Sequence, residues 1–410
     1  MYIRRLIVRN FRSIEEMDLE LAPITVVYGP NGSGKSSLLY ALLTLRNAAL
    51  MPNAAILSFF NYGFVNIGGF REVVFRHGAW REIKIGILVD CPWEEALRIP
   101  QAFQQIGYAV HLQENEGRFE LLAGEGDRVR SLASITVSFP YPGTQQVPIP
   151  FDDKLTIVWN GVIAQVQPKE PDFLREAEVM GRALNAPVEA LRRIRFVPLR
   201  RGFAQLVYSP IPITPFPITD GELATLLAQE SDLEYAVDRF LEDIADRNFR
   251  VRIQLGTSVF RLYSVDRQTG IGVDLVNEAF GINQIVYLLA QALHPDAGLI
   301  AIEEPEIHLH PTVIRQLARA LVRISQERKK QFLISTHSEV FITSLLAQVA
   351  ERRLSPEELA CYFAENRQGR SVFTRQQVNE HGQIEGGLRT FIEAELEDLQ
   401  SFLGVPEAFG

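Results

Sequence analysis

The sequence predicts an α/β protein that combines a mixed and parallel sheet, an antiparallel β subdomain and a helical insertion. The β-branched run Ile24–Tyr28 leads into a glycine-rich loop and then an apolar helix expected from about Lys35 to Ala49. Short apolar segments separated by Gly, Pro and Asp turns recur from about residue 55 to 167, which indicates antiparallel strands. From about residue 281 helices and strands alternate again, as expected of a second α/β unit.

The same patterns divide the chain into three expected units. Residues 1–170 form an N-terminal lobe that carries the glycine-rich loop and the antiparallel β subdomain. Residues 171–248 are expected to form a helical and proline-rich insertion, because prolines at positions 210, 212, 215 and 217 exclude regular helix there. Residues 249–410 form a C-terminal lobe, with a last helix expected near Leu388–Phe402.

Composition narrows the class of protein. The formal net charge of −9 argues against non-specific coating of nucleic acid, but it does not exclude a local basic groove that binds nucleic acid. The two cysteines, Cys91 and Cys361, lie in no metal-ligand or disulfide pattern, so reducing cytoplasm is the expected compartment. No signal peptide is evident and no apolar run reaches about eighteen residues, so a soluble protein without membrane contact is expected.

The segment Gly29–Ser36, with the sequence GPNGSGKS, has the spacing of a Walker A loop. In such a loop backbone N–H groups surround phosphate oxygens, Lys35 reaches the terminal phosphates and the Ser36 hydroxyl binds Mg²⁺. A plain glycine turn between a strand and a helix would not require Lys and Ser after its last glycine. ATP and Mg²⁺ are therefore the expected cofactors. The candidate binding residues of the loop are Asn31, Gly32, Ser33, Gly34, Lys35, Ser36 and Ser37.

Two carboxylates follow an apolar strand expected at Leu299–Ile302. Glu303 is placed to hold Mg²⁺ and Glu304 to orient or deprotonate the attacking water. Alternatively, the two acids solvate a strand end or cap the helix that begins near Pro311. The Walker A loop favours the catalytic interpretation.

A third hydrophobic strand, Phe332–Ser335, leads into Thr336 and His337, and His337 is placed to contact a γ-phosphate or the attacking water. Taken alone, His337 would be a residue at the start of a helix. Lys35 and Glu303 are 268 positions apart (303 − 35), whereas Glu303 and His337 are 34 apart (337 − 303). A large insertion therefore separates the two lobes.

The chain resembles the SMC/RecF/OLD group of ABC-type ATPases over nearly its whole length. The resemblance rests on the Walker A loop and on the segments Asn10–Ser13, Glu303–Pro311 and Ser335–Ser338. The string EEPEIHLHP is similar to OLD-like ATPases of bacterial conflict systems more than to the motors of membrane transporters. The resemblance implies an ABC-type ATPase head. It gives Glu303 the Walker B role at Mg²⁺, Glu304 the role of catalytic base and His337 that of the switch histidine, and it places Arg12 and Ser13 near the nucleotide.

The resemblance also implies a signature segment that engages the nucleotide of a second subunit. The candidate is Asn277–Gln284, which departs from the usual Ser-Gly-Gly pattern. Gly281 and Asn283 would present backbone N–H groups and a side-chain amide to phosphate from a helix start, and a plain glycine turn is the alternative. The family also has a glutamine in a loop near the nucleotide, and the sequence offers three alternative candidates for this position: Asn61, Asn66 and Gln101.

Two further clusters allow a functional and a structural interpretation. Arg200 and Arg201 would form a basic edge for DNA or a contact to nucleotide in trans, but paired arginines are more often solvated or ion-paired. His308 and His310, with Glu306, are expected to shape a subunit interface rather than bind zinc.

The resemblance implies an ATP hydrolase that forms a homodimer or higher oligomer around ATP. OLD nucleases carry a TOPRIM domain, whereas the 73 residues after His337 (410 − 337) show no two-metal arrangement of acids. The expected output is therefore a separate effector such as a nuclease or toxin, with DNA as a possible partner, in anti-phage defence or DNA maintenance and repair. The alternative is a nucleotide-gated scaffold or DNA-end sensor with little hydrolysis.

Overall fold

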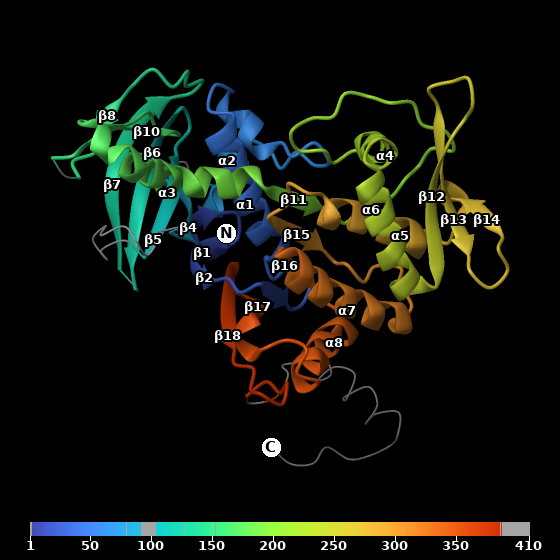
Figure 1. Cartoon of the computed structure of the whole chain (residues 1–410). Coiled ribbons are helices and arrows are strands. Elements are labelled where there is room, and N and C mark those ends of the chain that lie inside the picture. The colour runs from blue at the N-terminus through green and yellow to red at the C-terminus, as the bar shows by residue number, and fades with distance from the viewer. Residues whose placement is uncertain are drawn as a thin grey trace, which may run out of the picture.

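The structure is a computed structural model that describes residues 2–385, except 79, 92–103, 127 and 152, together with Gly387. The expected helix at Leu388–Phe402 and the candidate Gln101 lie outside the described residues. The described part of the chain contains four sheets, one of them mostly parallel and one long and antiparallel, with helices packed around them (Figure 1). This architecture confirms the predicted mixed α/β fold class.

A six-stranded sheet forms the centre of the molecule. Its first five strands are parallel to their neighbours and the last one is antiparallel. The P-loop strand β3 lies between β16 and β17, which come from the opposite end of the chain. The range predicted as a helical insertion also contributes the edge strand β11. In spatial order the strands are β11 (Ile194–Val197), β15 (Leu299–Glu303), β16 (Gln331–Thr336), β3 (Ile24–Tyr28), β17 (Leu359–Arg367) and β18 (Arg370–Gln376).

The two faces of the central sheet carry two separate hydrophobic cores. Side chains alternate along a strand, so Val27 of β3 packs into one core while Val26 and Tyr28 pack into the other. On the first face lie α1 (Lys35–Leu50), α3 (Leu174–Arg192) and the antiparallel sheet. On the second face lie α4 (Asp220–Gln229), α5 (Ser231–Ala245), α6 (Phe280–Leu293), α7 (Pro311–Arg328) and α8 (Glu339–Ala350).

The predicted antiparallel β subdomain is a six-stranded sheet in the order β2-β1-β4-β5-β6-β7, with a small sheet of order β10-β9-β8 beside it. The short apolar segments expected to form antiparallel strands between about residues 55 and 167 supply the strands β4–β10. The bounds are β1 (Ile3–Phe11), β2 (Ile14–Glu20), β4 (Ile83–Asp90), β5 (Gln105–Leu112), β6 (Glu116–Glu125), β7 (Arg128–Ser138), β8 (Val147–Pro148), β9 (Leu155–Trp159) and β10 (Ala164–Pro168).

An irregular proline-rich segment connects β11 to α4, and its last turn is fixed by a capping box. Thr219 accepts a hydrogen bond from the Glu222 backbone, and Glu222 accepts one from the Thr219 backbone. After α5 the chain forms a sheet on the side of the molecule opposite the antiparallel sheet (Figure 1). It consists of β12 (Arg247–Ile253), β13 (Phe260–Asp266) and β14 (Gly272–Asp274).

The remaining helices of the described residues are short. They are α2 (Phe70–Val73) and the 3₁₀ turns η1 (Ile56–Phe60), η2 (Phe75–His77), η3 (Pro171–Phe173), η4 (Leu275–Asn277) and η5 (Pro356–Glu358). None of the helices that the structure describes has both the length and the apolar composition needed to cross a bilayer.

Candidate nucleotide-binding and catalytic site

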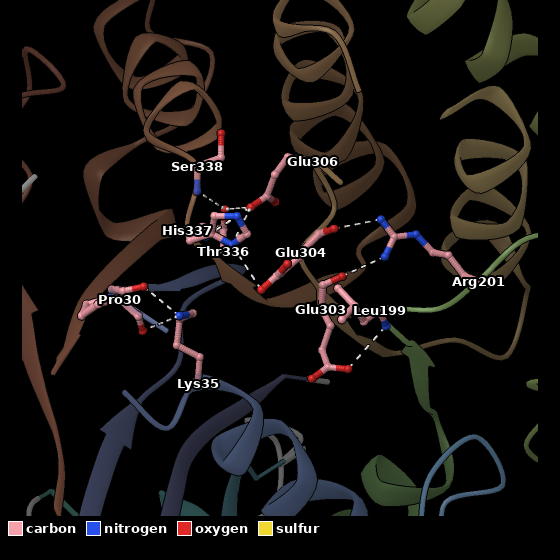
Figure 2. Close-up of polar contacts among 11 residues, drawn as sticks. Pro30, Lys35, Leu199, Arg201, Glu303, Glu304, Glu306, Thr336, His337 and Ser338 are labelled. Carbon is pink, nitrogen blue, oxygen red and sulfur yellow. Dashed lines mark hydrogen bonds and ion pairs between the residues drawn. The ribbon is translucent and has the colours of Figure 1, made fainter. Parts of the chain in front are cut away.

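Three sequence motifs meet at one edge of the central sheet. The P-loop follows β3, Glu303 and Glu304 stand at the end of β15, and His337 follows β16. These strands are parallel neighbours, with Glu303 opposite Ser335 and Thr336 opposite Tyr28. Carboxyl ends of adjacent parallel strands share an edge, so residues separated by more than 300 positions face one another there (Figure 2).

The P-loop has a backbone that requires glycine. Gly34, the N-cap of α1, has φ +99°, and a Cβ at this position would lie 2.0 Å from the Ser371 Oγ of β18. The loop therefore places the N-terminus of α1, with its unpaired N–H groups, against open space. This space is a pocket of about 340 Å³. It is lined by Arg12, Ser13, Asn31, Gly32, Gly34, Lys35, Ser36, Ser37 and Glu304.

The pocket brings together most of the residues that the sequence predicted to bind nucleotide. Arg12 and Ser13 reach it because they form the two-residue turn between β1 and β2, and the Ser13 Oγ is 2.7 Å from that of Ser371. Ser33 is the exception among the predicted loop residues. Its side chain is buried, does not line the pocket, and has no hydrogen-bond partner for Oγ among the described residues.

Lys35 extends back over the loop. Its Nζ donates hydrogen bonds to the carbonyl oxygens of Gly29 at 2.7 Å and Pro30 at 2.9 Å. Burial lowers the pKa of Lys35, and the nearby carboxylates of Glu304 and Glu306 oppose this effect. A phosphate oxygen would give this ammonium a charged acceptor, which forms a stronger hydrogen bond than a neutral carbonyl.

Glu303 is buried at the end of β15, beside the first turn of α1. Its Oε2 lies 3.3 Å from the Tyr40 hydroxyl and 3.4 Å from the Leu199 backbone nitrogen, and its carboxylate is hydrogen-bonded to Ser36. Burial raises the pKa of Glu303, and the hydrogen bonds from Ser36, Tyr40 and Leu199 offset only part of this effect.

The pairing of Ser36 and Glu303 fits Mg²⁺. This ion uses oxygen ligands and is commonly held by one or two protein groups together with substrate phosphates and water. The cation would also compensate the buried charge of Glu303. Across the described ranges there is no group of three or more His, Cys, Asp or Glu side chains that would form an independent metal cage.

Glu304 lies between the P-loop pocket and His337. Its φ of +43° is in the left-handed region, which is rare for a residue with a side chain and is often found at functional sites. Its backbone nitrogen donates a hydrogen bond to the Ser335 carbonyl at 2.8 Å, and its Oε1 lies 3.2 Å from Nδ1 of His337 (Figure 2). A carboxylate that lines the pocket and contacts a half-exposed imidazole has the geometry required to orient a water molecule.

Glu306 is a site residue whose role the sequence did not reveal. Its Oε1 accepts hydrogen bonds from Thr336 Oγ1 at 2.6 Å and from the His337 backbone at 3.2 Å, so it ties the His337 loop to the loop after β15. Its Oε2 is buried without a partner among the described residues, and burial raises its pKa. His308 and His310 are exposed and make no such contact.

Arg201 is a second residue with an unforeseen role. Its guanidinium is buried and donates hydrogen bonds to the carbonyls of Pro198 at 3.0 Å, Glu303 at 2.8 Å and Glu304 at 2.9 Å (Figure 2). Burial lowers the pKa of Arg201 to about 10, which leaves it cationic at neutral pH. The sequence suggested a DNA edge or a contact in trans for Arg200 and Arg201. Arg200 is exposed, whereas Arg201 is buried against the backbone of the two acids.

The signature candidates have different environments. Gly281, in the first turn of α6, packs so closely on the loop between β15 and α7 that a Cβ there would lie 2.8 Å from Leu309 Cδ2. Asn283 is buried, and its amide bonds to the backbone N–H and carbonyl of Phe203 and to the Leu275 carbonyl. Neither half of the Asn283 amide is free to reach a phosphate, which corrects the expectation for this side chain.

Two of the glutamine-loop candidates, Asn61 and Asn66, do not line the nucleotide pocket. Asn61 and Asn66 are exposed and paired with each other in an isolated bridge, and their side chains accept hydrogen bonds from the backbones of Gly63 and Gly68. Tyr40, which no motif singled out, does contact the site. Its hydroxyl faces Glu303, and the guanidinium of Arg12 lies 5.5 Å from its ring centre.

Comparisons with known proteins agree with this geometry. The family model described as an AAA ATPase domain matches residues 1–77 and 218–342, the two parts of the chain that contain the P-loop and the acids of β15. An OLD nuclease from Thermus scotoductus is 24% identical over 354 residues, which cover 83% of this chain and 59% of the nuclease. The chain thus spans less than two thirds of that relative's length.

Two further similarities are more local or purely structural. The DNA replication and repair protein RecF of Edwardsiella ictaluri is 54% identical over 46 residues, which cover 11% of this chain and 13% of RecF. The solved structure of an SMC head bound to the C-terminal winged-helix domain of ScpA shares the fold, with a TM-score of 0.51 at 11% identity over 93% of this chain and 99% of the other. Motifs, fold and matches together support an ABC-type P-loop ATPase that is similar to the SMC, RecF and OLD proteins.

Proposed function

We propose that this protein is an ATP-hydrolysing switch that dimerises around ATP and controls a partner effector or a DNA transaction. The observation that carries the proposal is the Glu304–His337 pair, which lies 3.2 Å apart at the rim of the P-loop pocket. An ATP-binding module without hydrolysis would not need a carboxylate held in the left-handed region beside an imidazole.

Each residue has a task in the proposed reaction. The P-loop backbone and Lys35 bind the phosphates of ATP, and Ser36 and Glu303 would hold Mg²⁺. When bound, this ion would neutralise charge that develops on the phosphate oxygens. Glu304 accepts the proton of the attacking water, and His337 fixes the carboxylate of Glu304 by a hydrogen bond.

A second copy of the chain would complete the site. The nucleotide pocket is open to solvent on one side, and the start of α6 exposes Phe280, whose ring packs edge-on against His308 with 4.9 Å between ring centres. A large exposed aromatic beside Gly281 supports the use of this surface as an interface. In the proposed dimer the backbone N–H groups at Gly281 contact the phosphates bound by the other copy.

We propose that the switch controls a separate effector protein such as a nuclease, or acts on DNA itself, in anti-phage defence or DNA maintenance. Relatives named as an OLD nuclease and as RecF support this direction, and a related SMC head was solved with a bound partner domain. The test is mass spectrometry of what co-purifies with the Glu304→Gln protein from the native host in the presence of ATP. Recovery of neither a specific protein nor nucleic acid would contradict an effector role.

The hydrolysis proposal is tested by the same Glu304→Gln substitution. The amide cannot accept a proton, so turnover is expected to fall by about 10²–10⁴-fold, while ATP binding persists. ATP-bound dimers should then accumulate and be visible by light scattering. Glu16→Gln, an exposed carboxylate of β2, is the matched control and should hydrolyse ATP normally. Equal turnover in the Glu304→Gln and wild-type proteins would exclude Glu304 as the base.

A nucleotide-gated scaffold or DNA-end sensor with little hydrolysis is the second candidate. The internal use of the Asn283 amide favours it, because the signature segment then offers only backbone groups to the opposite phosphate. Turnover of purified wild-type protein, with and without linear DNA, separates the two functions. ATP-dependent dimerisation without measurable turnover would support the scaffold.

A further inference from the structure

A second pocket lies at the opposite end of α1 from the P-loop. It has a volume of about 280 Å³ and is bounded by the last turns of α1, the loop after η1, the edge strand β11 and the proline-rich segment at 214–219. Two arginines line it, Arg46 from α1 and Arg195 from β11, and each is only 5% exposed. Neither arginine contributes to the nucleotide site described above.

Neither arginine forms a direct ion pair with a described carboxylate, although the more distant Asp296 and Glu230 favour the charged form of Arg195. Of the carboxylates that the structure describes, none lies within 4.0 Å of either guanidinium. Arg46 makes only long hydrogen bonds to Asn47 Oδ1, at 3.3 and 3.4 Å, and stacks on the ring of Phe216 at 4.2 Å. Arg195 donates to the Pro215 carbonyl at 2.8 Å and contacts His294 Nδ1 at 3.4 Å, while its Nε has no partner among the described residues.

Both groups stay charged in this environment. Burial, together with the charge of Arg195, lowers the pKa of Arg46 to about 9, so its guanidinium is still protonated at neutral pH. Two buried cations that face one pocket repel each other and have lost their hydration. Such an arrangement is stabilised by an anion that enters the pocket.

The acid in the pocket wall is already engaged. Glu222 accepts hydrogen bonds from the backbone and hydroxyl groups of Thr214 and Thr219 and from the Ile218 backbone. Burial alone would raise the pKa of Glu222, but these hydrogen bonds outweigh it and leave the pKa lowered. The charge of Glu222 therefore stabilises the turn before α4 and is not directed to the arginines.

We propose that this pocket binds the phosphate group of a small ligand. Planar guanidinium forks match the oxygens of phosphate, and a doubly charged anion compensates two cations where a single carboxylate compensates one. The volume of about 280 Å³ lies just below the range of small-molecule sites, which is typically about 300–1,000 Å³, and so favours a small ligand. The rings of Tyr62, Phe196 and Phe216 in the wall can pack against an organic moiety. A nucleic-acid backbone does not fit, because it requires arginines at the surface.

The test uses the full-length Lys35→Ala protein, in which the P-loop loses its phosphate-binding charge. Calorimetric titration with inorganic phosphate and with ribose 5-phosphate should each show one site, with ribose alone as the uncharged control. Addition of Arg195→Gln should weaken binding at least tenfold, whereas Arg9→Gln, which removes an exposed arginine of β1, should not change it. Tighter binding of the ester identifies an organic phosphate as the ligand, and equal affinity identifies free phosphate. Binding of neither compound at millimolar concentration, or binding unchanged by Arg195→Gln, overturns the proposal.

A second measurement leaves both arginines in place, since replacement of a buried arginine can unfold a protein. Crystals of the Lys35→Ala protein are soaked in tungstate, a tetrahedral dianion that scatters anomalously. A peak within hydrogen-bond distance of both Arg46 and Arg195 is expected. Ordered arginines without such a peak would refute the site independently of any variant at these positions.

Discussion

Replacement of Arg201 by methionine tests how the two acids at the end of β15 are held in place. Methionine fills a similar volume but donates no hydrogen bonds, so the carbonyls of Pro198, Glu303 and Glu304 lose the donors that lie 2.8–3.0 Å away. The side chain of Arg201 touches neither the P-loop nor the pocket that it forms. The substitution therefore separates the positioning of the acids from nucleotide binding.

The size of the effect follows from these contacts. A buried carbonyl left without a donor costs about 1–3 kcal/mol, so three cost ~3–9 kcal/mol. Removal of a buried charge returns several kcal/mol of desolvation energy, which leaves a net loss of ~3 kcal/mol in the free energy of unfolding. In the folded fraction, release of the Glu304 carbonyl lets the carboxylate drift, and a displacement of about 1 Å lowers kcat by ~10²-fold.

Urea denaturation, ATP turnover and titration with a fluorescent ATP analogue measure these quantities on one sample. We expect the Arg201→Met protein to bind the analogue with wild-type affinity and to turn over slowly at a temperature at which it is folded. Arg201→Lys should recover part of kcat, because an ammonium reaches fewer of the three carbonyls. Wild-type kcat in folded Arg201→Met protein, or an equal loss of affinity and kcat, would refute the positioning role.

Three further outcomes are expected. Lys35→Ala removes the countercharge for phosphate and should weaken binding of the ATP analogue at least tenfold; unchanged affinity would contradict the Walker A assignment. Gly34→Ala should abolish this binding in a folded protein, because the new Cβ would lie 2.0 Å from Ser371 Oγ at a φ of +99°, and nucleotide binding by that variant would argue against the loop geometry. Burial, with a smaller effect of Arg195, lowers the pKa of His294 from 6.5 to about 4, so an unfolded chain is protonated at higher pH than the folded one. The free energy of unfolding should therefore keep its full value above about pH 6.5 and fall by at most ~3 kcal/mol as the pH drops to 4. Urea denaturation of His294→Gln should show a weaker dependence of this free energy on pH.

The parts of the site that were predictable from sequence depend on local backbone geometry. A strand, a loop that needs left-handed φ at Gly34, and a helix start beside Lys35 lie within a dozen residues, so the pattern itself encodes the phosphate site. The same holds for Glu303 and Glu304, which stand where a strand leaves the sheet. The mixed α/β class followed because strand and helix periodicities differ clearly along the chain.

The parts that were not predictable depend on contacts between distant segments. Arg201 acts through the carbonyls of residues about 100 positions away, and Glu306 acts through Thr336, 30 positions away. No local pattern marks such pairings, since any buried arginine or glutamate has the same sequence appearance. Asn283 was misjudged for the same reason, because its helix-start position was visible but its partner Phe203 was not.

The position of β3 between β16 and β17 has a consequence for biosynthesis. Ile24 pairs with Phe332 on one side and with Leu359 on the other, which are 308 (332 − 24) and 335 (359 − 24) positions later. A growing chain on the ribosome therefore exposes the GPNGSGKS segment long before the strands that flank it exist. Pairings of such long range form late and slowly, so the nascent N-terminal region depends on the antiparallel sheet or on chaperones for protection until then. Nucleotide binding would therefore require that synthesis has passed β17, so truncated products could not enter the proposed dimer as inactive, ATP-loaded subunits.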